Sequence, residues 1–406
     1  MNKNTNQGKD EEQLPKVMHA RTVTGTGGGP EKTIINSPKF LASLGYEAEC
    51  LFLRPKGDPG FDVLRERAKN ASAPLIEIDD DGKFSIKMVK EVIRCVRERD
   101  VKIWHAHDYK SNLLGIIVNR FHPMRLITTA HGWVNFDGLT PLYYWLDKKL
   151  FLPRYESVIC VSSTVMEQAT AGGTPKSKCI LIDNAIDHEQ FSRQLSISEA
   201  KLKFHDMTGN SLLVGSIGRL APEKGFDLLI NAVAKLIKNG LDAYLKIAGE
   251  GPEKSNLEKQ IDSLGMRDRI QLMGFQSDTR SFYESLDMFV LSSHREGLPN
   301  VVLEAMAVGT PVIATNIDGV PKIIHDGING VLIPPNDEIT LARQIQVLAN
   351  NASLRCKLSH EGQQTIQQHW SFKNRIKTIT ALYSKTESRK ASELFPNSFK
   401  ATKDRN

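Results

Sequence analysis

The chain has 406 residues, of which 40% are hydrophobic and 25% are charged, as in an ordinary globular protein of two or three domains. Its longest apolar runs, such as Leu113–Val118, are far shorter than the roughly 20 residues that a membrane-spanning helix needs. The net charge of +6 is small for this length, and no basic run is interleaved with aromatic residues, so nucleic acid is disfavoured as a partner.

The N-terminus and the cysteines indicate a cytoplasmic protein. Residues 1–16 are polar and lack the apolar segment of a secretion signal, so we expect a disordered leader there. The five cysteines are scattered, without the paired spacing of a zinc site or a disulfide framework. Buried free thiols in a reducing compartment explain them most simply.

Short apolar runs alternate with helical patterns along most of the chain, which is typical of an α/β fold. A polar stretch at residues 192–210 divides them, and we expect two doubly wound domains, residues 17–191 and 192–370. A last amphipathic helix, residues 371–385, precedes a polar tail at residues 386–406 that is expected to be disordered. The expected strands are residues 17–20, 50–53, 75–78, 101–104, 126–129 and 158–161 in the first domain, and residues 212–214, 245–248, 270–272, 288–291, 312–314 and 331–333 in the second.

Three consecutive glycines follow the first expected strand and open a helix. The absence of Cβ atoms at Gly27, Gly28 and Gly29 lets backbone amides approach a ligand. A simple turn is the alternative, since the spacing is not that of a dinucleotide-binding loop. Pro38 lies inside the expected helix and is predicted to kink or shorten it.

Further polar groups follow other strands of the first domain. The segment Asp79–Asp81 has the carboxylate spacing of a divalent-ion site, but the adjacent Gly82 favours a turn. His105 and His107 alternate at a strand end, and the sequence suggests no third metal ligand. His131 can donate to a sugar hydroxyl or to an incoming nucleophile, while a purely structural histidine is the alternative.

Two cations follow the first strand of the second domain. Arg219 and Lys224 lie on the loop before a clear amphipathic helix. Because the carboxyl ends of parallel strands form the ligand edge of such a sheet, both project where a diphosphate would lie. Arginine binds phosphate oxygens with two parallel donors, and lysine adds a compact charge that stabilises a leaving group. A solvated surface pair is the alternative.

The most informative segment contains two glutamates, Glu296 and Glu304. The first falls, with Gly297 and Leu298, on a loop that follows a buried strand and precedes a helix. If Asn300 caps that helix, Glu304 lies one turn in, where its carboxylate can accept hydrogen bonds from the two hydroxyls of a ribose. The alternative is an acid that only complements the helix dipole.

In order and spacing, these segments resemble glycosyltransferase family 4, a large group of retaining enzymes with the GT-B fold. The resemblance covers the chain from Val17 to about Lys385. An extra glycine and Pro30 alter the usual opening of the glycine loop, which affects the acceptor side. The segments that carry the resemblance are Gly27–Gly29, the His131 turn, Val161–Ser163, Asn184–Asp187, Gly218–Gly225, Ala248–Pro252, Gly274–Phe275 and Glu296–Glu304.

The resemblance implies two Rossmann-like domains that face each other across a cleft, with a nucleotide-diphosphate sugar bound chiefly to the second. Arg219 and Lys224 would hold the diphosphate, and Glu304 would hold the ribose. Gly274 and Phe275 would flank the base. The helix 371–385 would pack back onto the first domain.

By the same resemblance, Glu296 and the loop amides beside it would position the sugar, while His131 and the glycine-loop amides would reach across the cleft from the acceptor side. The residues assigned to catalysis are Glu296, His131, Arg219 and Lys224, and those assigned to the donor are Gly28, Gly29, Arg219, Lys224, Gly274, Phe275, Gly297, Leu298 and Glu304.

The family implies a retaining transfer without an enzymic nucleophile. The acceptor would attack the face from which the phosphate departs, and the phosphate would help to accept its proton. Positioning and charge stabilisation are then the protein's part, and neither a metal ion nor another cofactor is required. The expected reaction moves a hexose or N-acetylhexosamine from a UDP-sugar, or alternatively from GDP-mannose, to a glycan or lipid-linked acceptor in cell-surface polysaccharide or lipopolysaccharide synthesis.

An aromatic and basic segment is the candidate acceptor surface. It could meet a lipid-linked glycan at an anionic membrane, on the cytoplasmic face. The alternative is an amphipathic helix whose apolar residues Leu142, Trp145, Leu146 and Leu150 face the core. The surface comprises Trp133, Phe136, Tyr143, Tyr144 and Trp145, with Lys148, Lys149 and Arg154 nearby.

Other activities fit the same architecture. A nucleotide-sugar epimerase would need no acceptor, and a phosphorylase would need inorganic phosphate and usually pyridoxal phosphate. A non-catalytic nucleotide-sugar-binding protein is the third alternative. It is disfavoured because a degenerate copy would be expected to have lost some of His131, Arg219, Lys224, Glu296 and Glu304.

Overall fold

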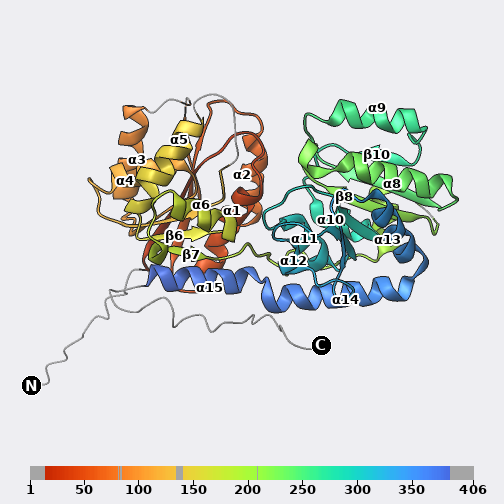
Figure 1. Cartoon of the computed structure of the whole chain (residues 1–406). Helices are drawn as coiled ribbons and strands as arrows, with labels where there is room; N and C mark the ends of the chain where they lie inside the picture. Colours follow the sequence, from red (N-terminus) through yellow and green to blue (C-terminus); the bar gives the residue numbers. More distant parts are fainter. Residues whose placement is uncertain (1–13, 81, 83–84, 134–139, 208, 385–406) are drawn as a thin grey trace, which may run out of the picture. The chain divides into compact units, whose positions relative to one another are not determined.

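The computed structural model describes residues 14–80, 82, 85–133, 140–207 and 209–384 and contains two compact units (Figure 1). One unit takes in the chain up to Ile182 and again from Ile376, and the other takes in Asp183–Arg375. No helix in these described ranges is both long enough and apolar enough to cross a bilayer.

The first unit is built on a parallel sheet of seven strands in the order β3-β2-β1-β4-β5-β6-β7. The order reverses at β1, next to β4, as in doubly wound folds, and ligands bind beside such a reversal. The strands are β1 (Lys16–Thr22), β2 (Glu47–Arg54), β3 (Leu75–Asp79), β4 (Ile103–Ala106), β5 (Arg125–Ala130), β6 (Ser157–Cys160) and β7 (Cys179–Leu181); the helices are α1 (Gly29–Ala42), α2 (Phe61–Asn70), α3 (Ile86–Glu98), α4 (Tyr109–Val118), α5 (Thr140–Leu146), α6 (Ser163–Ala171) and, ending in this unit, α15 (Phe372–Tyr383).

The second unit is a parallel sheet of six strands in the order β10-β9-β8-β11-β12-β13. Its order reverses between β8 and β11, so the loops after these two strands flank the expected ligand position. The strands are β8 (Leu212–Ile217), β9 (Ala243–Ala248), β10 (Ile270–Leu272), β11 (Met288–Leu291), β12 (Val312–Thr315) and β13 (Val331–Ile333); the helices are α7 (Ile197–His205), α8 (Phe226–Lys238), α9 (Lys254–Leu264), α10 (Thr279–Ser285), α11 (Asn300–Val308), α12 (Val320–Ile323), α13 (Glu338–Asn350) and α14 (Ala352–His369).

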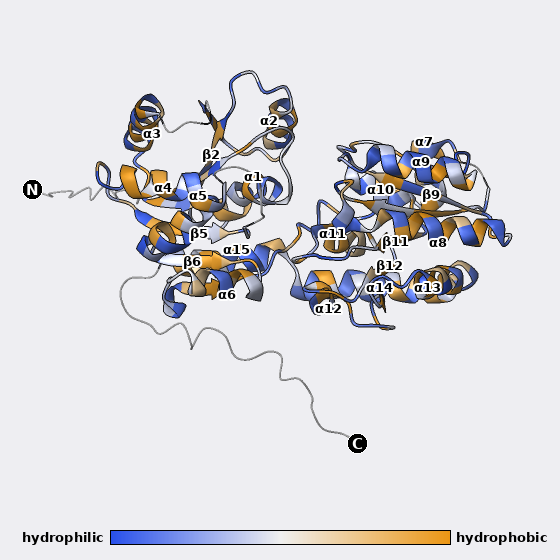
Figure 2. Cartoon of the chain, turned by 45° about the horizontal axis from the view of Figure 1, so that its top comes forward, coloured by the Kyte–Doolittle hydropathy of each residue, from blue (hydrophilic) through white to orange (hydrophobic). Residues whose placement is uncertain are grey.

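Because helices cover both faces of each sheet, the central strands read as nearly continuous apolar runs, interrupted in the first sheet by His19 and His105. Every residue of β4, β6, β11 and β12 is buried. Two hydrophobic clusters flank the second sheet, one around Leu229 and Leu341 under α8 and α13, the other around Phe289 and Met306 under α10 and α11. Figure 2 shows the helices as two-toned, with hydrophobic and hydrophilic residues alternating along them, as this arrangement requires.

All twelve predicted strands are present, and the predicted α/β class is confirmed. The prediction omitted β7 and α7. β7 has only three residues at the sheet edge, and α7 lies in a polar stretch where only Ala200 and Lys201 are buried. β7 is apolar but too short to stand out, and α7 lacks an apolar pattern strong enough to detect.

The limits of the two units differ from the expected ones. Lys16, which we placed in the leader, is the first residue of β1. The second unit begins at Asp183 and not after Phe191, because Ile186 and Phe191 belong to its hydrophobic core and the Ile186 N–H donates to the Trp370 carbonyl at 2.9 Å. The rest of the expected leader, residues 1–13, and the expected tail, residues 386–406, lie outside the described residues.

Pro38 does not shorten its helix, which was one of its two predicted effects, since α1 continues to Ala42 with Pro38 buried inside it. A proline leaves the carbonyl four residues earlier without its helical donor. That carbonyl belongs to Ile34, and it accepts a weak hydrogen bond from the Cys50 thiol at 3.6 Å. A buried cysteine of the adjacent strand β2 thus compensates for the missing N–H.

Candidate functional site

The loop after β8 and the loop after β11 are fastened together at the expected ligand edge of the second sheet. Gly225, with a φ of 58°, begins α8, and a Cβ atom there would lie 2.3 Å from the Ser292 carbonyl oxygen. The Ser292 hydroxyl donates to the Lys224 carbonyl at 3.1 Å, and the His294 N–H donates to the Glu223 carbonyl at 2.8 Å. These contacts hold the loop after β8 against the loop after β11, although the two loops are far apart in the sequence.

Two of the predicted catalytic residues, Lys224 and Glu296, are in direct contact. The Lys224 ammonium lies 2.6 Å from Oε1 of Glu296, and the Ser293 hydroxyl donates to the same oxygen at 2.7 Å. The Glu296 N–H donates to the Asp318 carboxylate at 2.8 Å. Both side chains are partly buried, so the contact holds the lysine at the strand ends and does not leave it as a freely solvated charge.

Arg219, the other predicted cation, is held less firmly. Its guanidinium lies 2.5 Å from the Glu223 carboxylate, and 60% of the arginine side chain is exposed. An exposed ion pair of this kind contributes about 0–1 kcal/mol, so an anionic ligand can displace Glu223 at little cost.

Glu304 lies deeper than the rest of its segment. The carboxylate is buried, and its Oε2 accepts a hydrogen bond from the Tyr283 hydroxyl at 3.0 Å. Burial, followed by the charge of Glu304, raises the pKa of Tyr283 well above its usual value, so the phenol remains the donor. Asn300 is the first residue of α11 and Pro299 precedes it, so Asn300 does not cap the helix as we expected.

The loops after β9 and β10 complete this edge of the sheet. The Gly249 N–H donates to the Gly274 carbonyl at 2.8 Å, and the Leu220 N–H donates to the Glu250 carbonyl at 2.9 Å. Phe275 is 43% exposed at this edge. The loops after β8, β10 and β11 therefore carry six of the predicted donor-binding residues, namely Arg219, Lys224, Gly274, Phe275, Gly297 and Leu298. The others lie elsewhere, Glu304 on α11 and Gly28 and Gly29 in the first unit.

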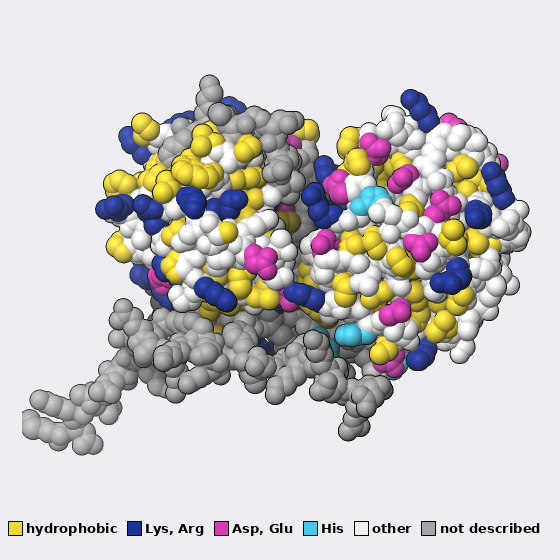
Figure 3. Space-filling view, in the orientation of Figure 1, with side chains coloured by type: hydrophobic (Ala, Val, Ile, Leu, Met, Phe, Trp, Pro, Cys, Tyr) yellow, Lys and Arg dark blue, Asp and Glu magenta, His cyan; other side chains and the backbone are white. Residues whose placement is uncertain are grey.

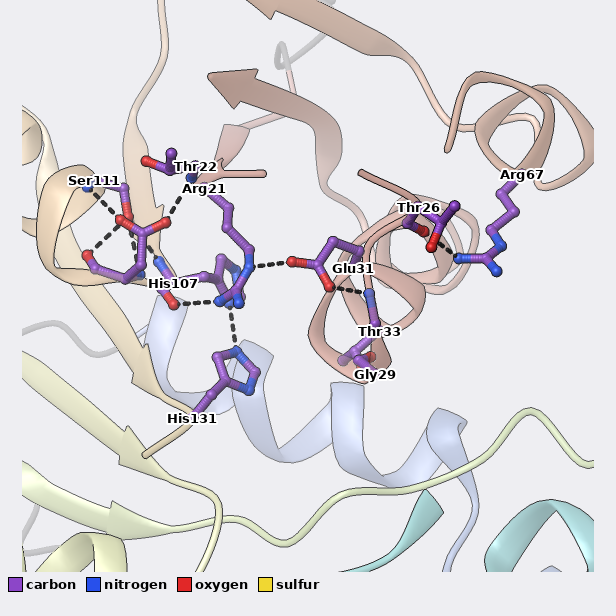
Figure 4. A network of polar contacts seen from close by, with 12 residues as sticks. Arg21, Thr22, Thr26, Gly29, Glu31, Thr33, Arg67, His107, Ser111 and His131 are labelled. Carbon is purple, nitrogen blue, oxygen red and sulfur yellow. Dashed lines mark hydrogen bonds and ion pairs between the residues drawn. The ribbon is translucent and has the colours of Figure 1, made fainter. Parts of the chain in front are cut away.

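In the first unit, a buried carboxylate organises the glycine loop (Figure 4). Glu31 accepts from the Arg21 guanidinium at 2.5 Å and from the Gly28 N–H at 2.6 Å, and Arg21 also donates to the His107 carbonyl at 2.7 Å. Pro30 fits the first turn of α1, where no N–H is needed. The Gly28 N–H is engaged inside the protein, contrary to the predicted ligand contact.

Four histidines gather around β1, β4 and β5, with His19 and His105 inside strands and His107 and His131 directly after them. His19 and His105 are register partners on neighbouring strands, and His107 stacks on His105 with ring centroids 4.5 Å apart. The His107 ring also lies within hydrogen-bonding distance of His19, at 3.0 Å, and of His131, at 3.2 Å. Burial first, and then the neighbouring histidines and Arg21, lower the pKa of His107 well below its usual value.

The buried histidines do not fit a metal ion. One nitrogen from each of His19, His105 and His107 lies within 4.8 Å of the others. A tetrahedral site needs lone pairs that converge on one point about 2.0–2.1 Å away. These rings are stacked, and both nitrogens of His105 already contact other groups, the Tyr383 hydroxyl at 2.6 Å and the Thr129 hydroxyl at 2.8 Å.

A pocket of about 470 Å³ opens at the carboxyl ends of β1, β2 and β3 in the first unit. Its lining includes Asp80 and Lys110, a buried ion pair with a separation of 2.5 Å, together with Thr22 and Tyr109. Asp80 also accepts from the Gly82 N–H at 3.0 Å, which agrees with the predicted turn. Asp81, from the same segment, lies outside the described residues.

Helix α5 presents its apolar side chains to solvent. None of its residues is buried, so the alternative that its apolar residues face the core is wrong. Figure 3 shows hydrophobic side chains gathered on the surface of this unit, with Lys and Arg side chains close by. Tyr143 stacks on Tyr109 of the pocket with ring centroids 5.5 Å apart. Phe136, also assigned to this surface, lies outside the described residues, and the exposed residues are Leu142, Tyr143, Trp145 and Leu150.

Both halves of the chain match families of known proteins. Residues 27–190 match the family described as Glycosyltransferase Family 4, and residues 198–365 match the one described as Glycosyl transferases group 1. The chain belongs to glycosyltransferase family 4. The predicted family is thus confirmed.

Individual glycosyltransferases are similar over parts of the chain. The lipopolysaccharide core biosynthesis glycosyltransferase LpsE of Rhizobium meliloti is 38% identical over 179 residues, which are 44% of this chain and about half, 51%, of that protein. The UDP-Gal:alpha-D-GlcNAc-diphosphoundecaprenol alpha-1,3-galactosyltransferase of Escherichia coli is 26% identical over 271 residues, 62% of this chain and 68% of that one.

Solved glycosyltransferase structures share the fold. Anabaena HepE in complex with UDP and glucose matches with a TM-score of 0.77, covering 91% of this chain and 99% of that one at 21% identity. With two parallel Rossmann-like sheets, the glycosyltransferase has the α/β GT-B fold that we predicted.

The sequence did not reveal several residues of these networks. Arg21 and Glu31 were not assigned a role, because their pairing depends on the tertiary fold. His19 could have been found, since alternation places it on the same face of β1 as His105 on β4 once the two strands are paired.

Proposed function

We propose that this glycosyltransferase moves a hexose or N-acetylhexosamine from a nucleotide-diphosphate sugar to a glycan or lipid-linked acceptor, with retention of the anomeric configuration. The observation that carries the proposal is the contact between Lys224 and Glu296 on fastened loops at the ligand edge of the second sheet. A cation for the leaving diphosphate would thereby lie beside a carboxylate for the sugar hydroxyls.

The donor side follows from the charges around that contact. Lys224 and Arg219 would bind the diphosphate, and Arg219 would leave its weak partner Glu223 to do so. Glu304 would bind the ribose and Phe275 would flank the base. A UDP-sugar is favoured because one similar transferase is named for UDP-Gal and one similar structure contains UDP, and GDP-mannose is the alternative.

The proposed mechanism needs no metal ion, because two cations would stabilise the departing phosphate. In this proposal Glu296 binds the sugar and does not act as the nucleophile, with one of its oxygens held by Lys224 and the Ser293 hydroxyl. Attack by the acceptor on the face from which the phosphate leaves accounts for retention. His131 would donate a hydrogen bond to the acceptor hydroxyl.

The acceptor side uses the pocket and the exposed helix of the first unit. A carboxylate, hydroxyls and the Tyr109 ring are the groups that bind a sugar, and the stack of Tyr109 on Tyr143 connects the pocket to the apolar surface of α5. This continuity supports an amphipathic, lipid-linked acceptor at an anionic membrane on the cytoplasmic side, in polysaccharide or lipopolysaccharide synthesis.

Thermal denaturation with a panel of UDP-, GDP- and ADP-sugars tests the donor. A ligand at 100 times its dissociation constant adds about 2.7 kcal/mol to the free energy of unfolding. We expect the UDP-sugars to raise the Tm most. The same mixtures, followed by NMR, would reveal an epimerase, which alters the free nucleotide sugar without any acceptor. If none of the donors shifts the Tm, the proposal is refuted.

A further inference from the structure

His107 has no part in the proposed reaction, yet it lies between two other imidazoles. Its Nε2 is 3.0 Å from Nδ1 of His19, and its Nδ1 is 3.2 Å from Nε2 of His131. His107 is only 4% exposed. Each of its ring nitrogens therefore meets another ring nitrogen, away from water.

The proton count couples the directions of these two hydrogen bonds. The groups that face His107 are His19 and Arg21 from β1, His105 from β4 and His131 after β5, and all of them disfavour a second proton on it. A neutral imidazole has one N–H. If that hydrogen is on Nδ1, His107 donates to His131 and accepts from His19; if it is on Nε2, both bonds reverse.

We propose that His107 is a positioning residue that donates from Nδ1 to Nε2 of His131 and so holds His131 as its Nδ1–H tautomer. The Nδ1–H of His131 is then the group that meets the acceptor hydroxyl. This inference rests on the role of His131 in the proposed function. If these histidines served only packing, they would not select which nitrogen of His131 bears the hydrogen.

Three substitutions of His107 separate its two hydrogen bonds. An asparagine amide can take the place of Nδ1, so His107→Asn preserves the contact with His131. A glutamine amide reaches the place of Nε2, so His107→Gln preserves only the contact with His19. His107→Phe removes both contacts and keeps a stacked ring. Thermal unfolding of each variant shows whether it folds. If the Phe variant does not fold, the Gln variant alone tests the loss of the contact with His131.

The primary readout is the nitrogen NMR spectrum of protein labelled at histidine, with the His131 signals identified by their loss in His131→Gln. We expect the Nδ1–H tautomer in the wild type and in His107→Asn, and a shift towards the Nε2–H tautomer in His107→Gln and His107→Phe. An Nε2–H tautomer in the wild type, or equal behaviour of the Asn and Gln variants, would overturn the inference.

The second readout is the slow release of UDP from UDP-glucose with water as acceptor. Misplacement of a group that orients the reactants can cost roughly 100-fold, so we expect a loss of kcat of about that size in the Gln and Phe variants, most of the rate in the Asn variant, and an unchanged KM for the donor. Equal rates in all three variants would contradict the inference. If the wild type releases no UDP from UDP-glucose while the tautomer is held as expected, UDP-glucose is excluded as the donor and the positioning of the ring stands.

Discussion

Lys224 is the residue on which the donor site depends most. We expect Lys224→Ala to reduce transfer by at least about 100-fold, because a preorganised charge at the leaving group contributes about 3 kcal/mol to catalysis. The fold should survive, since the hydrogen bonds that fasten the loop use the backbone of Lys224. The measurement is kcat/KM together with the Tm. Lys235→Ala, which removes an exposed lysine from α8, is the control, and near-normal turnover of Lys224→Ala would refute the role of Lys224.

Glu296 tests the sugar side of the same contact. Glu296→Gln keeps the shape of the side chain but removes the charge that pairs with Lys224 and accepts from Ser293. We expect transfer to be abolished while nucleotide binding, measured with UDP alone, is retained within about tenfold. A variant that transfers sugar at the normal rate would show that the carboxylate has no role in the reaction.

His205 gives the second unit a pH-dependent stability. Burial first, and then Lys246, lower the pKa of His205 to about 4. In the unfolded chain histidine binds a proton near pH 6.5, whereas the folded chain does not until about pH 4. The free energy of unfolding should therefore fall between about pH 6.5 and 4, by at most about 1.4 kcal/mol per pH unit.

The test compares the Tm at about pH 7 and about pH 5 in His205→Gln, on either side of the histidine pKa of the unfolded chain. We expect a smaller pH-dependent drop than in the wild type. His360→Gln, which alters an exposed histidine of α14, should keep the wild-type pH dependence. A His205→Gln variant with the same drop as the wild type would exclude His205 as the cause.

At the scale of elements, Gly225 lets the loop after β8 approach the loop after β11 closely. In Gly225→Ala the new Cβ would clash with the Ser292 carbonyl, in addition to the roughly 1 kcal/mol cost of a left-handed alanine. Gly240→Ala is the matched control, because Gly240 also has a positive φ but has no atom within 4 Å of a Cβ. We expect the Tm of Gly225→Ala to fall further than that of Gly240→Ala, and we expect Gly225→Ala to bind UDP more weakly. Equal decreases in Tm and in UDP binding in the two variants would contradict the claim that the contact between the two loops stabilises the site.

Helix α5 makes the membrane contact testable. Trp145 is 52% exposed, and Trp145→Glu would place a charge in the apolar surface that we assign to a lipid-linked acceptor. Flotation with anionic liposomes should decrease in this variant, while Ile339→Glu on α13, another exposed apolar position, should float like the wild type. If the wild type itself does not float, the membrane proposal is wrong.

The elements themselves were largely predictable, because strands that are buried on both faces form unbroken apolar runs. β7 was missed because it has only three residues, and α7 was missed because it lies in a polar stretch. The surface position of α5 could not be predicted, since its spacing of apolar residues fits a buried helix equally well. The continuity of α1 through Pro38 depends on Cys50, which belongs to another strand, and local sequence rules carry no such information.

At the scale of the whole molecule, motif order identified the family and the loops that carry the site. The pairings within the site depend on strand order. His105 meets Tyr383, 278 residues away, and Arg21 meets His107, 86 residues away. The Arg21 contact follows from the pairing of β1 with β4, and the Tyr383 contact follows from the packing of α15 in the first unit; a single sequence displays neither. The positions of the candidate residues were therefore predictable, and their supporting partners were not.

Calorimetric titration of the full chain with UDP tests the central claim most directly, because that claim is that the second sheet holds the diphosphate of a sugar donor. We predict one site per chain. UDP should bind at least about tenfold more weakly to Lys224→Ala, since the loss of a charge-assisted hydrogen bond costs roughly 1.5–3 kcal/mol. His131→Ala should bind UDP within error of the wild type. Unchanged affinity in Lys224→Ala, or no binding of UDP, GDP or ADP by the wild type, would contradict the account.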